Sequence, residues 1–222
     1  MRLVANESAR VTILFPLEEV APIGGASTRD IIETMKQRYA FLNTPDLSTA
    51  REELAKTGYK FQTGQFEHNG KKDNILDFAV YTDGLVANAA TTETAEAFLD
   101  NVIRMMRVEF GFRDFSTKPQ RYFLSNLIVE FDRPFAKVLS QFNKISKAIS
   151  QRIEQTYQIS VPMSLARLDF EIDKTLIKPT IARFNIDRRL GIPFDKERYF
   201  SGAPLRTSDH ISVLEEIEKS IN

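Results

Sequence analysis

The chain has 222 residues, 30 basic and 30 acidic side chains, and a hydrophobic content of 42%. This balance is typical of a soluble globular protein and argues against a general nucleic-acid binder, whose domain is usually basic. The absence of cysteine excludes disulfides, a thiol nucleophile and cysteine-ligated metal, and no apolar run approaches the ~18 residues of a membrane helix. We therefore expect a cytoplasmic protein that makes no membrane contact.

The first part of the chain predicts a strand followed by helices. Val11, Ile13 and Phe15 share one face of a short strand at 10–15, and the Pro- and Gly-rich stretch after it predicts a loop. Ser27 is expected to cap a helix that continues to Tyr39, since a serine side chain can accept from the free amides of the first turn. A second, short helix is expected at 47–56.

A three-stranded meander is expected next. Strands at 59–68 and 74–82 are joined at Asn69-Gly70, and Gly64 is a candidate for a bulge. Asp83-Gly84 is a two-residue hairpin signal that leads into a third strand. With this turn, Val80 is expected opposite Ala87 and Phe78 opposite Ala89. Alternation along the second strand places Leu76, Phe78 and Val80 on one face.

A helix is expected directly after the meander. Thr91 or Thr92 can cap its first turn, and Gly111 can end it in a left-handed conformation. Spacings of three and four residues predict one buried side, made of Ala95, Phe98, Leu99, Val102, Met105 and Met106.

The segment 120–157 predicts a central strand that leads into a long helix. Both faces of 120–131 are mostly apolar, which is typical of a strand with neighbours on both sides. Asp132 can cap the helix and Pro134 suits its first turn. The helix 134–157 is predicted to bury one apolar stripe, made of Phe135, Val138, Phe142, Ile145, Ile149 and Ile153.

The other side of this helix is basic. Within the helix no acidic residue precedes Glu154. The basic residues on or next to it are Arg133, Lys137, Lys144, Lys147 and Arg152. A solvated helix face is one interpretation. A docking face for an acidic protein partner or for phosphates is the other.

A second hairpin is expected from two alternating stretches at 165–173 and 180–188. One register pairs apolar with apolar residues (Phe170 with Phe184, Leu168 with Ile186) and acids with arginines (Glu171 with Arg183, Asp187 with Arg167). A short strand at 197–200, a turn at 201–204 and a final helix capped by Thr207 or Ser208 follow.

The order of elements predicts an α+β fold. Strand, helix, strands and helix occur twice, which suggests two similar β-α-β(2-3)-α halves, 1–115 and 116–222, or one continuous domain. We expect antiparallel strands with helices packed on one side. The order resembles the duplicated saddle of TATA-box-binding-protein-like folds, but a fold analogy does not establish function, and the neutral charge argues against DNA wrapping.

Three groups of residues were weighed for chemistry. The acids Asp169, Glu171 and Asp173 alternate along one strand and suit Mg²⁺ or Ca²⁺, but this spacing separates them by about 6.5–7 Å, so a salt-bridged face is the simpler interpretation. His68 and His210 form no zinc motif, and no Gly-x-Ser-x-Gly sequence supports a serine nucleophile. We therefore predict no catalytic residue, metal or cofactor.

The third group is a loop between a strand and a helix start. Its candidate phosphate-binding residues are Gly24, Gly25, Ser27, Thr28 and Arg29, where free amides and a cation could meet an anion. The loop lacks the lysine and the spacing of a P-loop. A plain loop that leads into a helix explains it equally.

The sequence favours a non-catalytic binding or assembly protein that acts through a sheet face or the basic face of helix 134–157. Its partner would be another protein or a second copy of the chain. A nucleotide- or metal-dependent enzyme that uses the Gly24–Arg29 loop with the acids Asp169, Glu171 and Asp173 is the first alternative. A nucleic-acid binder is the second, because residues after Gly111 hold 18 basic and 14 acidic side chains.

Overall fold

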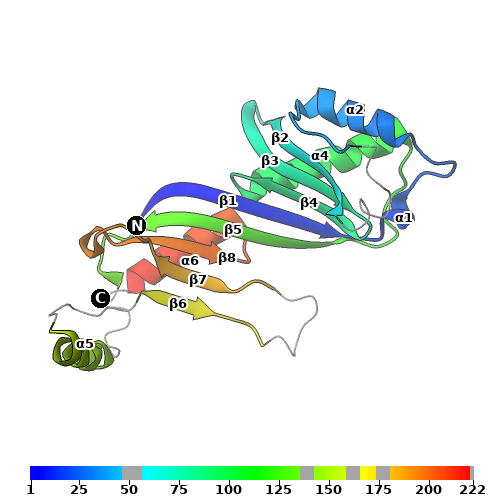
Figure 1. The fold of residues 1–222 in the computed structure, drawn as a ribbon. Coiled ribbons are helices and arrows are strands. Elements are labelled where there is room, and N and C mark those ends of the chain that lie inside the picture. Colours follow the sequence, from blue (N-terminus) through cyan, green and yellow to red (C-terminus); the bar gives the residue numbers. More distant parts are fainter. Residues whose placement is uncertain (47–56, 136–142, 159–165, 174–180, 221–222) are drawn as a thin grey trace. The chain divides into compact units, whose positions relative to one another are not determined.

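The computed structural model describes residues 1–46, 57–135, 143–158, 166–173 and 181–220. It is a mixed α+β protein with one antiparallel sheet, whose described strands follow the order β2-β3-β4-β1-β5-β8-β7-β6 (Figure 1). The strands are β1 Arg2–Leu14, β2 Tyr59–His68, β3 Lys71–Tyr81, β4 Gly84–Ala89, β5 Gln120–Glu130, β6 Arg167–Phe170, β7 Phe184–Arg188 and β8 Arg198–Ala203. The helices are α1 Leu17–Val20, α2 Thr28–Tyr39, α4 Thr92–Phe110, α5 Asn143–Tyr157 and α6 Thr207–Ser220, with a 3₁₀ turn at Phe194–Lys196.

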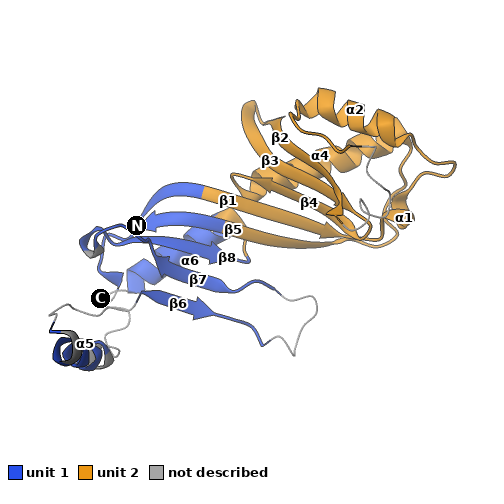
Figure 2. Ribbon diagram, in the orientation of Figure 1, with its two compact units in different colours: residues 1–6, 126–204, 208–222 blue, residues 7–125, 205–207 orange. Residues whose placement is uncertain are grey.

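The chain forms two compact units (Figure 2). Unit 1 contains residues 1–6, 126–204 and 208–222, and unit 2 contains residues 7–125 and 205–207. Strands β1 and β5 contribute residues to both units. No helix in the described ranges is both long and apolar enough to cross a membrane.

Helices α2 and α4 of unit 2 begin and end where the sequence predicts, whereas α1 lies in the stretch that was predicted as a loop. The Ser27 hydroxyl accepts from the Asp30 amide at 3.3 Å to start α2, and the Thr91 hydroxyl accepts from the Thr94 amide at 3.2 Å to start α4. Gly111 adopts a left-handed conformation, with φ of 69°, and ends α4. The helix predicted at 47–56 lies outside the described residues.

Both helices pack on the same face of the unit 2 sheet. Val11 and Ile13 from β1, Phe78 from β3 and Ala87 from β4 form one buried cluster with residues of α2 and α4. Five of the six predicted core positions of α4 are buried, and Met106 is partly buried. This confirms the expected arrangement of helices on one side of an antiparallel sheet for this unit.

The register of the β3–β4 hairpin differs from the prediction by two residues. Val80 pairs with Leu85 and Phe78 with Ala87, because Gly84 already pairs with Tyr81 and the turn consists of residues 82 and 83. A shift of two residues leaves each side chain on its predicted face. The large Phe78 therefore still faces a small alanine, and the helix α4 packs close to it.

The predicted bulge and the predicted face of β3 are also corrected. The β2–β3 register continues unchanged across Gly64, where a Cβ would overlap the Phe41 ring. The irregularity lies in β3 between Ile75 and Asp77, so Ile75 and Phe78 both point into the core. Leu76 is left 47% exposed, contrary to the predicted apolar face.

Two strands are longer than predicted. Strand β1 begins at Arg2 rather than at residue 10, because its first residues pair in the sheet while most of their side chains stay exposed and show no apolar alternation. The turn predicted at 201–204 is wrong, since residues 201–203 belong to β8 and are buried. Side chains of neighbouring strands pack closely there, and a Cβ at Gly202 would lie 2.7 Å from the Asn185 Oδ1 atom.

Unit 1 is built around the second hairpin and α6. The predicted β6–β7 register is confirmed, with Phe170 opposite Phe184 and Arg167 opposite Asp187. Leu214 of α6 is fully buried against the sheet. The residues that form this core are Leu127, Val129, Phe131, Phe135, Ile186, Tyr199 and Leu214.

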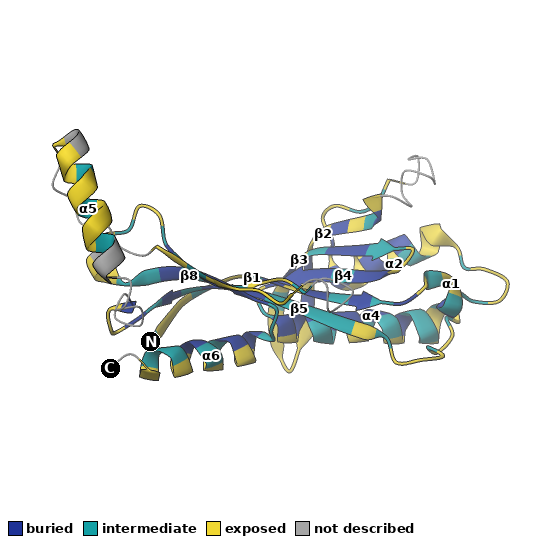
Figure 3. Cartoon of the chain, turned by 90° about the horizontal axis from the view of Figure 1, so that it is seen from below, coloured by how far each residue is buried: buried dark blue, intermediate teal, exposed yellow. Residues whose placement is uncertain are grey.

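The long helix predicted at 134–157 is described only from residue 143, as α5. Phe135 is buried and stacks on Phe131, with ring centroids 5.1 Å apart, as the predicted stripe requires. Val138 and Phe142 lie outside the described residues. Ile149 is 42% exposed, so the expectation that the single chain buries it is wrong, and Figure 3 shows the described part of α5 as mostly exposed.

We predict that Gly84→Ala is far more destabilising than Gly70→Ala. A Cβ at Gly84 would overlap the backbone carbonyl of Ile13, which cannot move aside, so the loss should be about 3 kcal/mol or more. Gly70 has a φ of 73° but open space around it, so its alanine variant should lose only about 1 kcal/mol. Urea unfolding of both variants measures the difference, and equal losses would contradict the packing.

Candidate functional site

Unit 2 contains a cavity of about 350 Å³. It lies between the buried sheet face, helices α2 and α4, and the loop before α2. Aromatic side chains form much of its wall: Phe15, Tyr59, Phe61, Phe78, Phe112 and Phe115. Aliphatic side chains of both helices, including Ile31, Ile103 and Met106, complete it.

One side of the cavity is bounded by an exposed loop. Gly25, Ala26 and Thr28 line the cavity, and Gly25 and Thr28 are also exposed to solvent. Ile23 on the same loop is 92% exposed. A ligand could therefore reach the apolar interior past this loop without unfolding the sheet.

Helix α1 and the segment after α4 form one wall of the cavity, here called the end wall, and hydrogen bonds join them. The backbone amide of Arg113 donates to the Val20 carbonyl at 2.8 Å, and its guanidinium donates to the carbonyls of Ala21 and Glu18 at 3.0 Å each. The Glu19 carboxylate accepts from the Ser116 hydroxyl and from its amide, and these bonds lower the pKa of Glu19. Helix α1 and the segment after α4 are thus joined into one wall.

Arg107 of α4 is the unusual residue of the site. Its Nη1 pairs with Asp114 at 2.7 Å, and its guanidinium lies over the Phe115 ring, 5.0 Å from the centroid. Its Nε is buried and has no hydrogen-bond partner among the described atoms. A buried N–H without a partner costs free energy, so a ligand oxygen that paired with it would remove that cost.

The structure places the predicted phosphate loop at the edge of this cavity. Gly24 and Gly25 have positive φ angles of 97° and 79°, and Ser27 uses its hydroxyl to cap α2. Thr28 and Arg29 occupy the first turn of α2 and are exposed. Gly25 and Thr28 thus line an apolar space, while phosphate binding by this loop remains a prediction.

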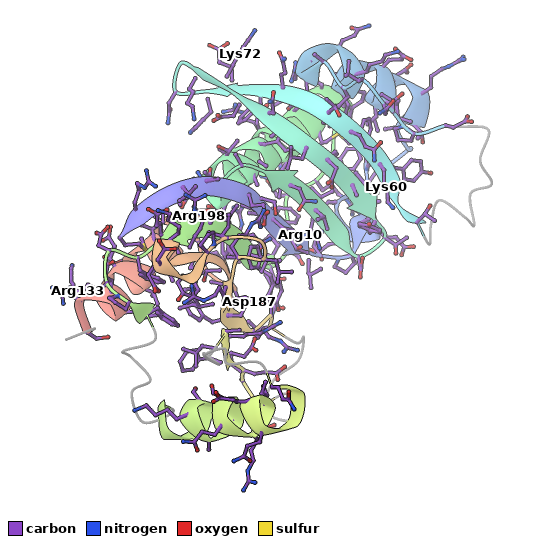
Figure 4. All side chains as sticks on the ribbon, turned by 60° about the vertical axis from the view of Figure 1, so that its left-hand side comes forward. Arg10, Lys60, Lys72, Arg133, Asp187 and Arg198 are labelled. Carbon is purple, nitrogen blue, oxygen red and sulfur yellow. The ribbon has the colours of Figure 1, made fainter. Side chains whose placement is uncertain are left out.

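The predicted basic docking residues are only partly described. Arg133 lies on the turn after β5 and is exposed (Figure 4). Lys147 and Arg152 are exposed on α5. Lys137 and the side chain of Lys144 lie outside what is described, so a common docking face remains a prediction.

Of the three predicted acids, Asp169 lies on β6 and forms ion pairs, whereas Glu171 and Asp173 follow the end of that strand, which is shorter than predicted. The Arg167 guanidinium donates to Asp169 at 2.6 Å and 3.0 Å, and this hydrogen bonding lowers the pKa of Asp169. Within the described residues, no group of three or more acids or histidines is placed to hold a metal ion. Asp169, Glu171 and Asp173 therefore do not converge on one ion.

His210 and Ser201 are adjacent in unit 1, but their hydrogen bonds do not activate the serine. The Ser201 hydroxyl donates to the Asn185 carbonyl at 2.7 Å, so it must accept from His210 Nε2 at 2.9 Å. In this arrangement His210 Nε2 carries the hydrogen and donates the hydrogen bond, so it cannot act as a base toward the serine. Both side chains are fully buried, which makes the pair a structural link between β8 and α6.

The face of the unit 2 sheet opposite the helices carries a polar row. Arg10, labelled on β1 in Figure 4, donates to the Asn88 amide oxygen at 3.0 Å. Asn88 donates in turn to Asp77 at 2.6 Å. These side chains use one another as partners, so the row strengthens the pairing of β1, β4 and β3 and offers little apolar surface for docking.

Sequence reasoning missed the cavity and Arg107. The signal that could have found Arg107 is its position four residues after Ile103, at the border of the apolar side of α4. Comparison with models of known protein families gave no match, and comparison with curated proteins gave none either. The site is therefore interpreted from its geometry.

We predict that His210 makes the protein less stable as the pH falls from about 6.5 to about 4. Burial lowers the pKa of His210 from 6.5 to about 4, so in this range the unfolded chain binds the proton and the folded chain does not. The loss should approach about 3 kcal/mol at the acid end. Urea unfolding across this range measures it.

His210→Gln removes this titration, so its unfolding free energy should depend less on pH than that of the wild type. His68→Gln, which changes the exposed histidine of β2, is the matched control and should keep the wild-type profile. A wild-type slope that survives in His210→Gln would contradict the assignment.

Proposed function

We propose that this protein is a non-catalytic binding protein and that unit 2 takes a small, mostly apolar molecule into its cavity. The cavity itself is the observation on which this proposal depends. Its volume of about 350 Å³ falls at the lower end of the range for small-molecule sites. Binding there would remove apolar ligand surface from water, which is favourable in proportion to the area buried.

The lining supports binding rather than catalysis. The described side chains that surround the cavity include two arginines and one tyrosine as titratable groups, and none is a carboxylate, a histidine or a lysine. General acid–base chemistry uses such groups close to neutral pH. The aromatic walls and the few polar groups are typical of sites that hold a ligand without changing it.

We predict that wild-type protein binds decanol, and that Ile103→Trp weakens this binding about tenfold or more because the larger ring fills the cavity. Ile103 lines the cavity from α4 and is only partly buried, so the helix can accommodate the change. Isothermal titration calorimetry with decanol measures the affinity, and circular dichroism checks the fold of the variant.

Val108→Trp is the matched control. Val108 lies on the same helix, is 78% exposed and does not line the cavity, so this variant should bind decanol as the wild type does. Equal binding of decanol to Ile103→Trp and to the wild type would reject the cavity as the ligand site.

We retain docking of a protein partner or a second copy through α5 as a second proposal. It is favoured by the exposure of Ile149 on the apolar side of this helix, two residues after the exposed Lys147 and three before the exposed Arg152. An exposed apolar side chain at a helical position predicted to be buried is common at contact surfaces.

If a second copy covers α5, light scattering should give a dimer mass for the wild type and a monomer mass for Ile149→Glu, since a buried carboxylate opposes the contact. Leu190→Glu is the control, because Leu190 is 95% exposed and lies on a turn after β7. A monomer mass for the wild type would leave a different protein as the only occupant to test.

A further inference from the structure

We infer that the ligand of unit 2 is an amphipathic monocarboxylate, whose apolar chain fills the cavity and whose carboxylate accepts a hydrogen bond from Arg107 Nε. This inference rests on the proposed function, since it names the chemical class of the molecule that the cavity binds. It follows from three features of Arg107 and its surroundings.

The first feature is the unused donor. The Nε of Arg107 is buried and has no partner among the described atoms, although Arg107 lines the cavity. Leaving a buried donor of a charged group unpaired costs more than leaving a neutral one. A ligand oxygen at this position would remove that cost, and a purely apolar ligand would not.

The second feature is the charge of the lining. The described cavity wall holds the guanidinium groups of Arg107 and Arg113 and no acidic side chain. Arg113 already donates to two backbone carbonyls, so its hydrogen bonds are committed to the end wall. Arg107 is thus the cation whose remaining donor can meet an anionic group, and a carboxylate matches an N–H of guanidinium in charge and geometry.

The third feature is the way in which the protein holds Arg107. Its guanidinium lies over the Phe115 ring, and Phe115 in turn packs edge-on against Phe15 at 4.8 Å between centroids. Asp114, which pairs with Nη1, is 84% exposed, so that ion pair lies at the surface and contributes little. The aromatic contact fixes the guanidinium while the exposed pair leaves the buried Nε for a ligand.

The experiment compares decanoate with decanol, which share a chain and differ in charge, by calorimetry at neutral pH below the concentration at which either aggregates. A charged hydrogen bond to Nε should make wild-type protein bind decanoate about tenfold more tightly than decanol. In Arg107→Gln this preference should fall to about twofold or less.

Arg104→Gln provides the matched control for charge. Arg104 is exposed on the same helix and does not line the cavity, so this variant loses the same charge and should keep the wild-type preference for decanoate. The wild-type comparison needs no variant, and equal affinities for the two molecules would overturn the inference even if Arg107→Gln unfolds.

The outcomes separate this inference from the proposed function. Equal wild-type affinities for decanoate and decanol, or a preference that survives in Arg107→Gln, would overturn the role of Arg107 and leave the cavity as an apolar site. Failure of the wild type to bind either molecule would reject the proposed function itself. A preference lost equally in Arg104→Gln would show general electrostatic attraction and would also overturn the inference.

Discussion

The packing of Phe98 is the interaction on which unit 2 depends. Its ring is fully buried on α4 and lies within 5.0–6.2 Å, between centroids, of Tyr39, Phe41, Phe66 and Phe78. Aromatic rings at these separations and tilts add to the free energy that their burial provides. One side chain thereby joins α4 to α2, to the segment after it, and to strands β2 and β3.

This cluster also explains where unit 2 leaves room. Phe78 touches Phe98 and lines the cavity, so one ring belongs both to the packed half of the interior and to the wall of the open half. Because the cluster holds α2 and α4 at the distance that large rings require, the space beyond it must be closed by other parts of the chain. Helix α1 and the residues after Gly111 form that closure, joined by Arg113 and Glu19.

Signals between neighbouring residues predicted the helices and strands, whereas contacts between residues distant in sequence determined details of strand register and packing. Ser27, Thr91 and Gly111 mark helix ends through bonds within a few residues, so sequence alone could place them. The β6–β7 register was predictable because both faces of the hairpin agree on it. The β3–β4 register was not, since it depends on a contact between Gly84 and the backbone of Ile13, which is 71 residues away in sequence. The small residues at the end of β8 were predicted as a turn, because the sequence does not show that Gly202 packs closely against Asn185 of β7.

The candidate site shows why a cavity is harder to predict than a core. A buried apolar stripe can be recognised from the residue spacing along one helix, whereas a cavity is the space that side chains from several segments leave unfilled. Arg107 sits at the border of such a stripe, where an arginine normally extends to water. Here the Arg107 guanidinium lies over the Phe115 ring instead, because the chain changes direction where α4 ends at Gly111. The helix end that the sequence predicted correctly thus helps to place the buried Nε of Arg107, which the sequence could not reveal.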